Sequence, residues 1–146
     1  MNDAAVVTVR TATAHDAERF AALLTDEGYP AGSSDLAARI ARFSVEDSHV
    51  LAAEASGEVI GFVAFHVMPR FENDELFARI VALVVDPGVR ARGIGRQLMS
   101  EAERVARDAG VSFLEVTAGH HRPEARKLFE SLGYDPGLAA YLRKRP

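Results

Sequence analysis

Hydrophobic and polar positions in the first half of the chain follow two periods, one typical of strands and one typical of helices. Residues 6–11 are rich in β-branched side chains and predict a first strand. Helical spacing follows in two segments, one from a candidate N-cap at Thr13 to position 24 and one from a candidate cap at Ser34. Residues 49–54 and 59–68 then predict two strands that form a hairpin through a Ser-Gly turn.

The second half of the chain alternates strands with helices. Residues 76–85 carry the strongest strand pattern, and their nearly continuous apolar run predicts that both faces of this strand are covered. The elements expected after it are a helix over 94–109, a strand over 113–118, a helix over 123–132 and a last strand over 138–144. A strand-helix-strand unit joins parallel strands, whereas a hairpin joins antiparallel ones. The order therefore predicts a mixed α/β fold with helices on both faces of the sheet.

Composition places the chain among single-domain globular proteins. Its 146 residues favour one domain over residues 1–146, and 48% apolar residues allow a sizeable core. Cysteine is absent, which excludes disulfides and zinc-thiolate sites. No apolar run reaches the length of a membrane span, and residues 1–10 lack a signal-peptide pattern, so a cytoplasmic protein without membrane contact is expected. The net charge of −4 argues against general nucleic-acid binding.

A glycine-rich basic turn joins the apolar strand to the following helix. It holds three arginines within seven residues: Arg90, Arg92 and Arg96. No acidic residue occurs between Asp86 and Glu101, which is a local reversal of charge in a net-acidic chain. Gly93 and Gly95 remove side chains where the backbone must approach something closely, and the helix start offers unpaired N–H groups. Together these features predict a site for a phosphate or pyrophosphate.

Other interpretations fit this turn less well. A Walker loop needs Gly-Lys-Ser/Thr, which the segment lacks, and a dinucleotide fingerprint needs a third glycine where Leu98 stands. The predicted hairpins of the first half also contradict the doubly wound fold of dinucleotide-binding domains. The plain alternative is a solvated loop whose glycines serve only backbone geometry, and this leaves the coincidence of glycines, arginines and a helix start unexplained.

Two segments carry a resemblance to a known family. Residues 90–95, Arg-Ala-Arg-Gly-Ile-Gly, match the R-x-x-G-x-G signature of the GCN5-related N-acetyltransferases, and residues 83–87 resemble the end of that family's fourth strand. Residues 125–134 resemble its closing motif, A-x-x-L-Y-x-x-x-G-F. The resemblance extends over nearly the whole chain. It implies a central mixed sheet of six to seven strands flanked by about four helices.

The resemblance also implies a chemistry, namely transfer of an acetyl group from acetyl-CoA to an amine. Backbone N–H groups of the signature loop would hold the pyrophosphate, and the pantetheine arm would lie along the fourth strand. The residues expected at the acetyl-CoA site are Leu83, Val84, Val85, Arg90, Ala91, Arg92, Gly93, Ile94, Gly95, Arg96, Arg122 and Phe129. The implied partners are acetyl-CoA and a small amine, and a homodimer is an option because the family often dimerises.

The chain departs from the family pattern at positions that serve proton transfer. Phe129 stands where the family commonly has a tyrosine that protonates the leaving thiolate, and Arg122 stands where an asparagine is common. The acid found on the fourth strand of many members has no equivalent here. A thiol has a pKa near 8.5, so departure of the thiolate needs no strong acid at neutral pH. The departures therefore affect the acid-base groups more than the acetyl-CoA site.

Candidate catalytic and substrate residues cluster around the next strand. Glu115 is a carboxylate inside an otherwise apolar strand and is the candidate general base, with an ion pair to Arg79 as the alternative. His120 and His121 follow that strand and are further catalytic candidates, with a solvated loop pair as the alternative. His66 and Arg79 are candidate substrate contacts, and the pattern around His66 favours its alternative, a structural histidine. None of the histidines has a recognised metal-ligand spacing, so no metal is expected.

The sequence leaves open which amine accepts the acetyl group and whether the protein has another function. Residues 61–66 and 119–125 resemble aminoalkylphosphonate and aminoglycoside acetyltransferases, which favours a small primary amine over a protein terminus. Residues 114–116, Leu-Glu-Val, resemble instead the ribosomal-protein alanine N-acetyltransferases, in which the glutamate acts as the base. The rival from another class is a CoA-binding regulatory or interaction module without turnover, which the missing tyrosine at position 129 motivates.

Overall fold

The computed structural model describes residues 6–89, 92–117, 123–138 and 141–146. Their order along the chain is β1 (Val7–Thr11), η1 (Ala14–Asp16), α1 (Ala17–Asp26), α2 (Ser33–Phe43), β2 (Ser48–Ala55), β3 (Glu58–Pro69), β4 (Leu76–Val85), η2 (Pro87–Val89), α3 (Ile94–Asp108), β5 (Val111–Val116) and α4 (Pro123–Ser131). The predicted elements up to α4 are present, with ends displaced by a few residues. The first helix begins at Thr13 as a short 3-10 turn, and α2 is capped by Gly32 rather than by Ser34.

The sheet has the order β1-β2-β3-β4-β5. The first three pairs are antiparallel and β4 pairs with β5 in parallel, which confirms the mixed sheet. The strand number is five among the described residues, so the expectation of six to seven was too high. The strand expected over 138–144 is absent from its described part, where Leu138 and Leu142 are 82% and 98% exposed. These side chains bury too little apolar surface to offset the entropy of ordering a strand.

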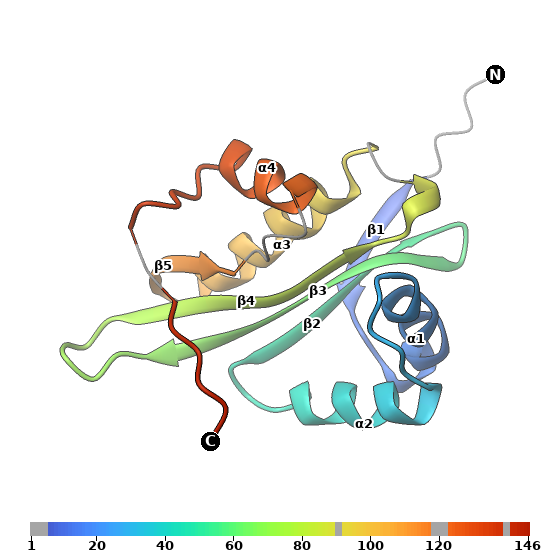
Figure 1. Cartoon of the computed structure of the whole chain (residues 1–146), viewed down its shortest axis with the longest axis horizontal. Helices are drawn as coiled ribbons and strands as arrows, with labels where there is room; N and C mark the ends of the chain where they lie inside the picture. Colours follow the sequence, from blue (N-terminus) through green and yellow to red (C-terminus); the bar gives the residue numbers. More distant parts are fainter. Residues whose placement is uncertain (1–5, 90–91, 118–122, 139–140) are drawn as a thin grey trace.

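Helices cover the sheet on both faces, with α1 and α2 on one side and α3 and α4 on the other (Figure 1). Alternate side chains of the central strands feed the two cores. On the α1 side, Phe20 stacks on Phe62 with ring centroids 4.1 Å apart. On the α3 side, Leu98 and Met99 are fully buried against the sheet. Most of β4 is covered as predicted, but Val81 is 44% exposed, for a reason that the site explains below.

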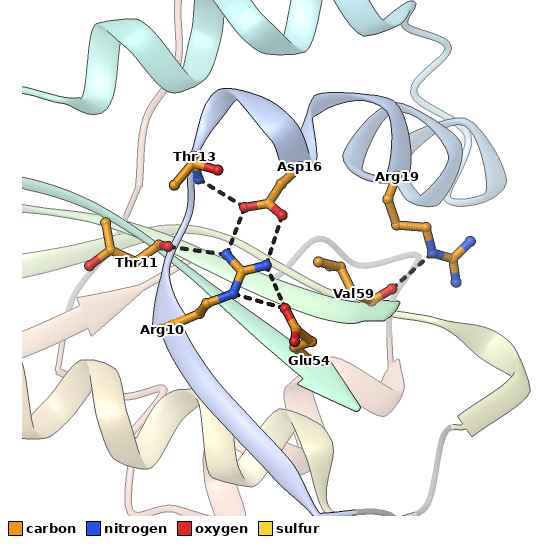
Figure 2. Close-up of polar contacts among 7 residues, drawn as sticks. All are labelled: Arg10, Thr11, Thr13, Asp16, Arg19, Glu54 and Val59. Atoms are coloured by element: carbon orange, nitrogen blue, oxygen red, sulfur yellow. Dashed lines mark hydrogen bonds and ion pairs between the residues drawn. The ribbon is translucent and has the colours of Figure 1, made fainter. Parts of the chain in front are cut away.

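A charged cluster anchors the first strand to the first helix and to β2 (Figure 2). Arg10 donates two hydrogen bonds of 2.9 Å to the two carboxylate oxygens of Asp16 and two more, of 2.7 and 3.0 Å, to Oε1 of Glu54. Asp16 is the one buried charged residue in the described part of the chain, and it also accepts the Thr13 N–H at 2.8 Å. The Arg10 guanidinium beside it holds the pKa of the Asp16 carboxyl below its usual range.

The lowered pKa of Asp16 predicts a pH-dependent contribution to stability. A carboxyl whose pKa is depressed in the folded state stabilises the protein above its unfolded pKa of 3.8 and loses that contribution as pH falls through the folded value. We expect Asp16→Asn to lower the free energy of unfolding at pH 7 by about 1–3 kcal/mol. The difference from the natural protein should shrink below pH 3. Urea denaturation at both pH values measures it.

Asp108→Asn is the matched control, because Asp108 forms an exposed ion pair with Arg104. This variant should change stability by less than about 0.5 kcal/mol. Equal losses from the two substitutions would show that burial of Asp16 adds nothing to the interaction.

Candidate active site

The parallel strand β5 covers only the first half of β4. Their pairing runs from Leu76–Val111 to Ile80–Val116, where β5 ends, whereas β4 continues to Val85 in its ladder with β3. A cleft lies beneath α4 where β4 extends past β5. The cleft is lined by Ile80, Val81, Ala82, Leu83, Val116, Thr117, Ala125 and Phe129.

A β-bulge lies on β4 at the mouth of this cleft. In the ladder with β3, Ala64 pairs with Ala82 and Phe65 pairs with Ile80, so Val81 is the extra residue between them. A bulge leaves its extra residue outside the ladder and turns it away from the regular pleat. This explains the exposure of the Val81 side chain, and it places backbone polar groups of β4 at the cleft. No sequence pattern marked this position, because Val81 lies inside an apolar run.

The first turn of α3 lies after β4 and η2 and has the properties of an anion site. Gly93 adopts φ 78° and ψ 14°, a left-handed conformation, and its carbonyl accepts the first helical bond from Gln97 at 3.0 Å. The preceding N–H groups of the first turn therefore have no helical acceptor. The first turn of α3 holds no acidic residue, and its N-cap makes no side-chain hydrogen bond. The other described α-helices each carry an acid there: Glu18, Asp35 and Glu124.

Two of the three predicted arginines of the turn are described. Arg92 is exposed beside the α3 start, whereas Arg96 donates from Nη2 to Oγ of Ser131 at 2.8 Å and so links α3 to α4. Gly95 also has a packing role. A Cβ placed on it would lie 2.9 Å from Cδ2 of Leu128, so glycine at this position lets the Leu128 side chain of α4 approach α3 closely. Arg90 and Ala91 lie outside the described residues.

A charged contact that the sequence did not reveal fixes the exit from β4. Arg19 of α1 donates from Nε to the Val59 carbonyl at 2.8 Å, as Figure 2 shows, and from Nη2 to Oδ2 of Asp86. The other oxygen of Asp86 accepts the Gly88 N–H at 2.9 Å, and its own N–H donates to the Ile60 carbonyl. The Asp-Pro-Gly turn is therefore held to α1 and β3 immediately before the glycine-rich segment.

Glu115 and Arg79 face each other across the last part of the β4–β5 ladder. Arg79 donates to Oε1 of Glu115 from Nε at 2.8 Å and from Nη2, so the ion-pair alternative is present in the structure. The bonds to Glu115 raise the pKa of Arg79. The guanidinium carbon also lies 5.2 Å from the centre of the Tyr141 ring. Burial, and then the charge of Glu115, raise the pKa of the Tyr141 hydroxyl.

The remaining predicted residues divide into those beside the cleft and those away from it. Phe129 is buried, lines the cleft and packs edge-on against Tyr134, whose hydroxyl donates to Glu103 at 2.7 Å. His66 contacts Oγ of Ser48 through Nδ1 at 2.9 Å and stacks on Phe43, with ring centroids 4.7 Å apart. These contacts are those of a structural histidine. His120, His121 and Arg122 lie outside the described residues.

The described residues form neither a metal centre nor a membrane-spanning helix. No group of three or more His, Cys, Asp or Glu side chains there could hold a metal ion. No helix of the described part has the length and apolar character needed to cross a membrane.

Comparison with known sequences gives the family of this chain. The sequence model of the acetyltransferase (GNAT) family matches residues 14–134. The chain therefore belongs to this family, whose members use acetyl-CoA as the acetyl donor.

Two curated relatives and one solved structure give the range of similarity. The chain is 34% identical over 110 residues to the uncharacterised N-acetyltransferase YhfO of Bacillus subtilis, covering 73% of this chain and 72% of the relative. It is 33% identical over 86 residues to the aminoalkylphosphonate N-acetyltransferase of Salmonella typhimurium, covering 59% and 56%. An aminoglycoside N-acetyltransferase solved in complex with CoA shares the fold, with a TM-score of 0.82 at 18% identity and coverage of 100% and 99%.

The anion site at the start of α3 predicts a selective effect on CoA affinity. We expect Arg92→Ala to weaken CoA binding by about 3- to 10-fold, because one exposed charge is removed beside the open N–H groups. Isothermal titration calorimetry measures the dissociation constant. Arg107→Ala removes the same charge from the last turn of the same helix, about 20 Å away, and should leave CoA affinity unchanged. Equal effects of the two variants would contradict this site.

Proposed function

We propose that this protein transfers the acetyl group of acetyl-CoA to the primary amine of a small molecule, by direct attack while both substrates are bound. The observation that carries the proposal is the cleft between β4 and β5, which has the acid-free start of α3 near one end and Glu115 near the other. An extended thioester-bearing arm suits such a cleft. The anionic part of the donor suits the N–H groups of α3.

The donor site that we propose keeps the residues expected from the sequence. The first turn of α3 and the arginines beside it hold the pyrophosphate, and the end of β4 and Phe129 contact the arm. The full set is Leu83, Val84, Val85, Arg90, Ala91, Arg92, Gly93, Ile94, Arg96, Arg122 and Phe129, with Gly95 setting the approach of α4. Acetyl-CoA supplies the thioester when bound. The acid-free first turn of α3 suits its pyrophosphate, and the cleft beside the end of β4 suits its extended arm.

Backbone groups at the bulge favour the reaction by their position. The Val81 backbone lies outside the β3 ladder at the cleft mouth, and we assign its N–H as the donor to the thioester oxygen, where negative charge develops during attack. The transfer forms a C–N bond and breaks the C–S bond, and the electron pair leaves on sulfur. A thiolate is stable enough to leave without a strong acid, which makes phenylalanine at position 129 compatible with turnover.

Glu115 is the proposed base that takes the proton of the attacking ammonium, directly or through one water. The Glu115 side chain is about one-fifth exposed, and it lies one residue before Val116, which lines the cleft from the other face of the sheet. Arg79 holds one of its oxygens and so fixes the position of the carboxylate. His120 and His121 are the next candidates for this role.

Replacement of the proposed base predicts a pH-dependent loss of activity. Glu115→Gln keeps the size of the side chain and removes its basicity, so we expect kcat at pH 7 to fall by about 10²- to 10⁴-fold. The loss should shrink at high pH, where free amine is abundant. CoA affinity should stay nearly unchanged.

The same variant distinguishes a base from a structural ion-pair partner. A purely structural role predicts a lower melting temperature with full activity per folded molecule. Glu101→Gln is the control, because it breaks an ion pair with Arg104 on the surface of α3 and should leave kcat unaltered. Normal turnover of Glu115→Gln at pH 7 would transfer the role to His120 or His121.

The acceptor class is proposed from the chemistry of the relatives. One curated relative is named for aminoalkylphosphonates and one structural neighbour for aminoglycosides, and both compounds are small amines. Another structural neighbour is a ribosomal-protein-alanine N-acetyltransferase, which keeps a protein N-terminus as the second candidate. A CoA-binding module without turnover is the third.

Release of free thiol from acetyl-CoA across a panel of amines separates these three functions. We expect small primary amines to raise the rate above the amine-free background, with an N-acetylated product detected by mass spectrometry. Peptides with a free N-terminal alanine should react more slowly. Faster reaction of the peptides would assign a protein acceptor. CoA binding without thiol release for any amine or peptide would assign the non-catalytic module.

A further inference from the structure

A second pocket lies next to the cleft, on the sheet face opposite α3. Leu114 and Val116 of β5 point toward α3, so alternation places Phe113 and Glu115 on the other face. The core side chains of α1 and α2 pack on that face mainly against β2 and β3, and Figure 1 shows β5 at the far side of the sheet from these strands. The pocket is lined by Pro69, Arg70, Phe71, Glu72, Phe77, Arg79, Phe113 and Glu115.

Aromatic rings form one side of this pocket. Phe77 and Phe113 pair across β4 and β5 and lie nearly parallel, with ring centroids 5.2 Å apart and planes inclined by 9°. The guanidinium carbon of Arg70 lies 5.4 Å from the centre of the Phe113 ring. Phe71, in the loop between β3 and β4, is fully exposed. Aromatic side chains gathered on an accessible surface are typical of binding sites.

The charged side chains that line the pocket are paired with one another. Arg70 pairs with Glu72 at 2.9 Å and approaches Glu75 at 3.7 Å, and Arg79 donates to Oε1 of Glu115. Neither guanidinium group is therefore free of a carboxylate partner to bind an anion. Arg79, a candidate substrate contact, forms the ion pair that was the alternative for it.

The pocket and the cleft lie at adjacent levels of the two strands, and the side chains that border them there point to opposite faces of the sheet. Arg79 and Glu115 line the pocket, and the next residues, Ile80 and Val116, line the cleft. A strand rises about 3.3 Å per residue, so the phenylalanine pair lies about 7 Å from the level of Glu115 and about 13 Å from the level of Val81. An acceptor seated on the rings could thus present its nitrogen near the carboxylate and the cleft mouth.

We propose that this pocket binds the aromatic ring of the acceptor, a primary amine joined to the ring by an extended chain of about four to six carbons. The ring lies on Phe77 and Phe113, and the ammonium group lies beside Glu115. This inference specifies the acceptor of the proposed acetyl transfer, and the role of the pocket as an acceptor site rests on that proposal. Binding of a ring to Phe77 and Phe113 does not itself require catalysis.

Matched amines test the pocket. We expect 4-phenylbutylamine and 6-phenylhexylamine to have a KM about 3- to 10-fold below that of hexylamine, with similar kcat, because only the former place a ring on the phenylalanine pair. Benzylamine is too short to place its ring on the phenylalanine pair and its nitrogen beside Glu115 at the same time, so its KM should not be lowered. Phe113→Leu and Phe77→Leu should raise the KM of the aryl amines by about the same factor and that of hexylamine by clearly less, because leucine keeps an apolar surface for an alkyl chain. Unchanged CoA affinity of the variants shows that they are folded.

Binding measured without turnover keeps this inference separate from the proposed function. Calorimetric titration of the same amines into the protein with CoA present reports the pocket alone. Equal affinity of aryl and alkyl amines would overturn the pocket, even if both are acetylated. Aryl preference that is lost in Phe113→Leu would support it, even if no amine is acetylated, and would then contradict the proposed reaction. Sedimentation showing a dimer that Phe71→Ser dissolves would assign the surface to a second copy instead.

Discussion

The end of the β4–β5 pairing at Ile80 and Val116 is the constraint on which the candidate site depends. A parallel ladder normally satisfies the backbone polar groups of both strands, whereas β4 runs past the last β5 residue of its ladder and its bulge leaves Val81 outside the pairing with β3. The β3 ladder continues along β4 to Val85 and holds this strand in place. The backbone at the bulge is therefore held in position, which is the property that an oriented hydrogen-bond donor needs.

Charge is arranged to keep the start of α3 positive in a chain with a net charge of −4. The described α-helices other than α3 place an acid at their own first turn, where it offsets the positive end of the helix dipole. The first turn of α3 has none, so that end remains available to an anion. Asp86, the nearest preceding acid, is bonded to Arg19 and to a backbone N–H, and its charge is thereby neutralised at the exit from β4. The acid-free first turn of α3 and the ion-paired Asp86 together keep uncompensated negative charge away from the start of this helix.

Local patterns predicted the elements that surround the cleft, because each is marked by a strong period or a breaking residue. The expected strand over residues 76–85 has the bounds of β4, and α3 ends one residue before the expected position. The bulge at Val81 was not predictable, since it depends on the register with β3 and not on the side chain. The packing role of Gly95 depends likewise on Leu128, which lies far along the chain. The prediction of a last strand was wrong for its described part, because a short apolar segment is insufficient where its large side chains, Leu138 and Leu142, stay exposed.

Glu115 shows why sequence alone left two roles open at one residue. An acid in an apolar strand predicts either chemistry or a counter-ion, and the register places Arg79 directly opposite, so the counter-ion is present. The two roles are compatible in space. The guanidinium holds one carboxylate oxygen, and the stacked rings of Phe77 and Phe113 lie two residues before the pair on the same face. The ion pair therefore stands between an aromatic surface and the mouth of the cleft. In that position a single carboxylate can attract an ammonium group, orient it and receive its proton, whereas a carboxylate without a fixed partner would have no defined direction.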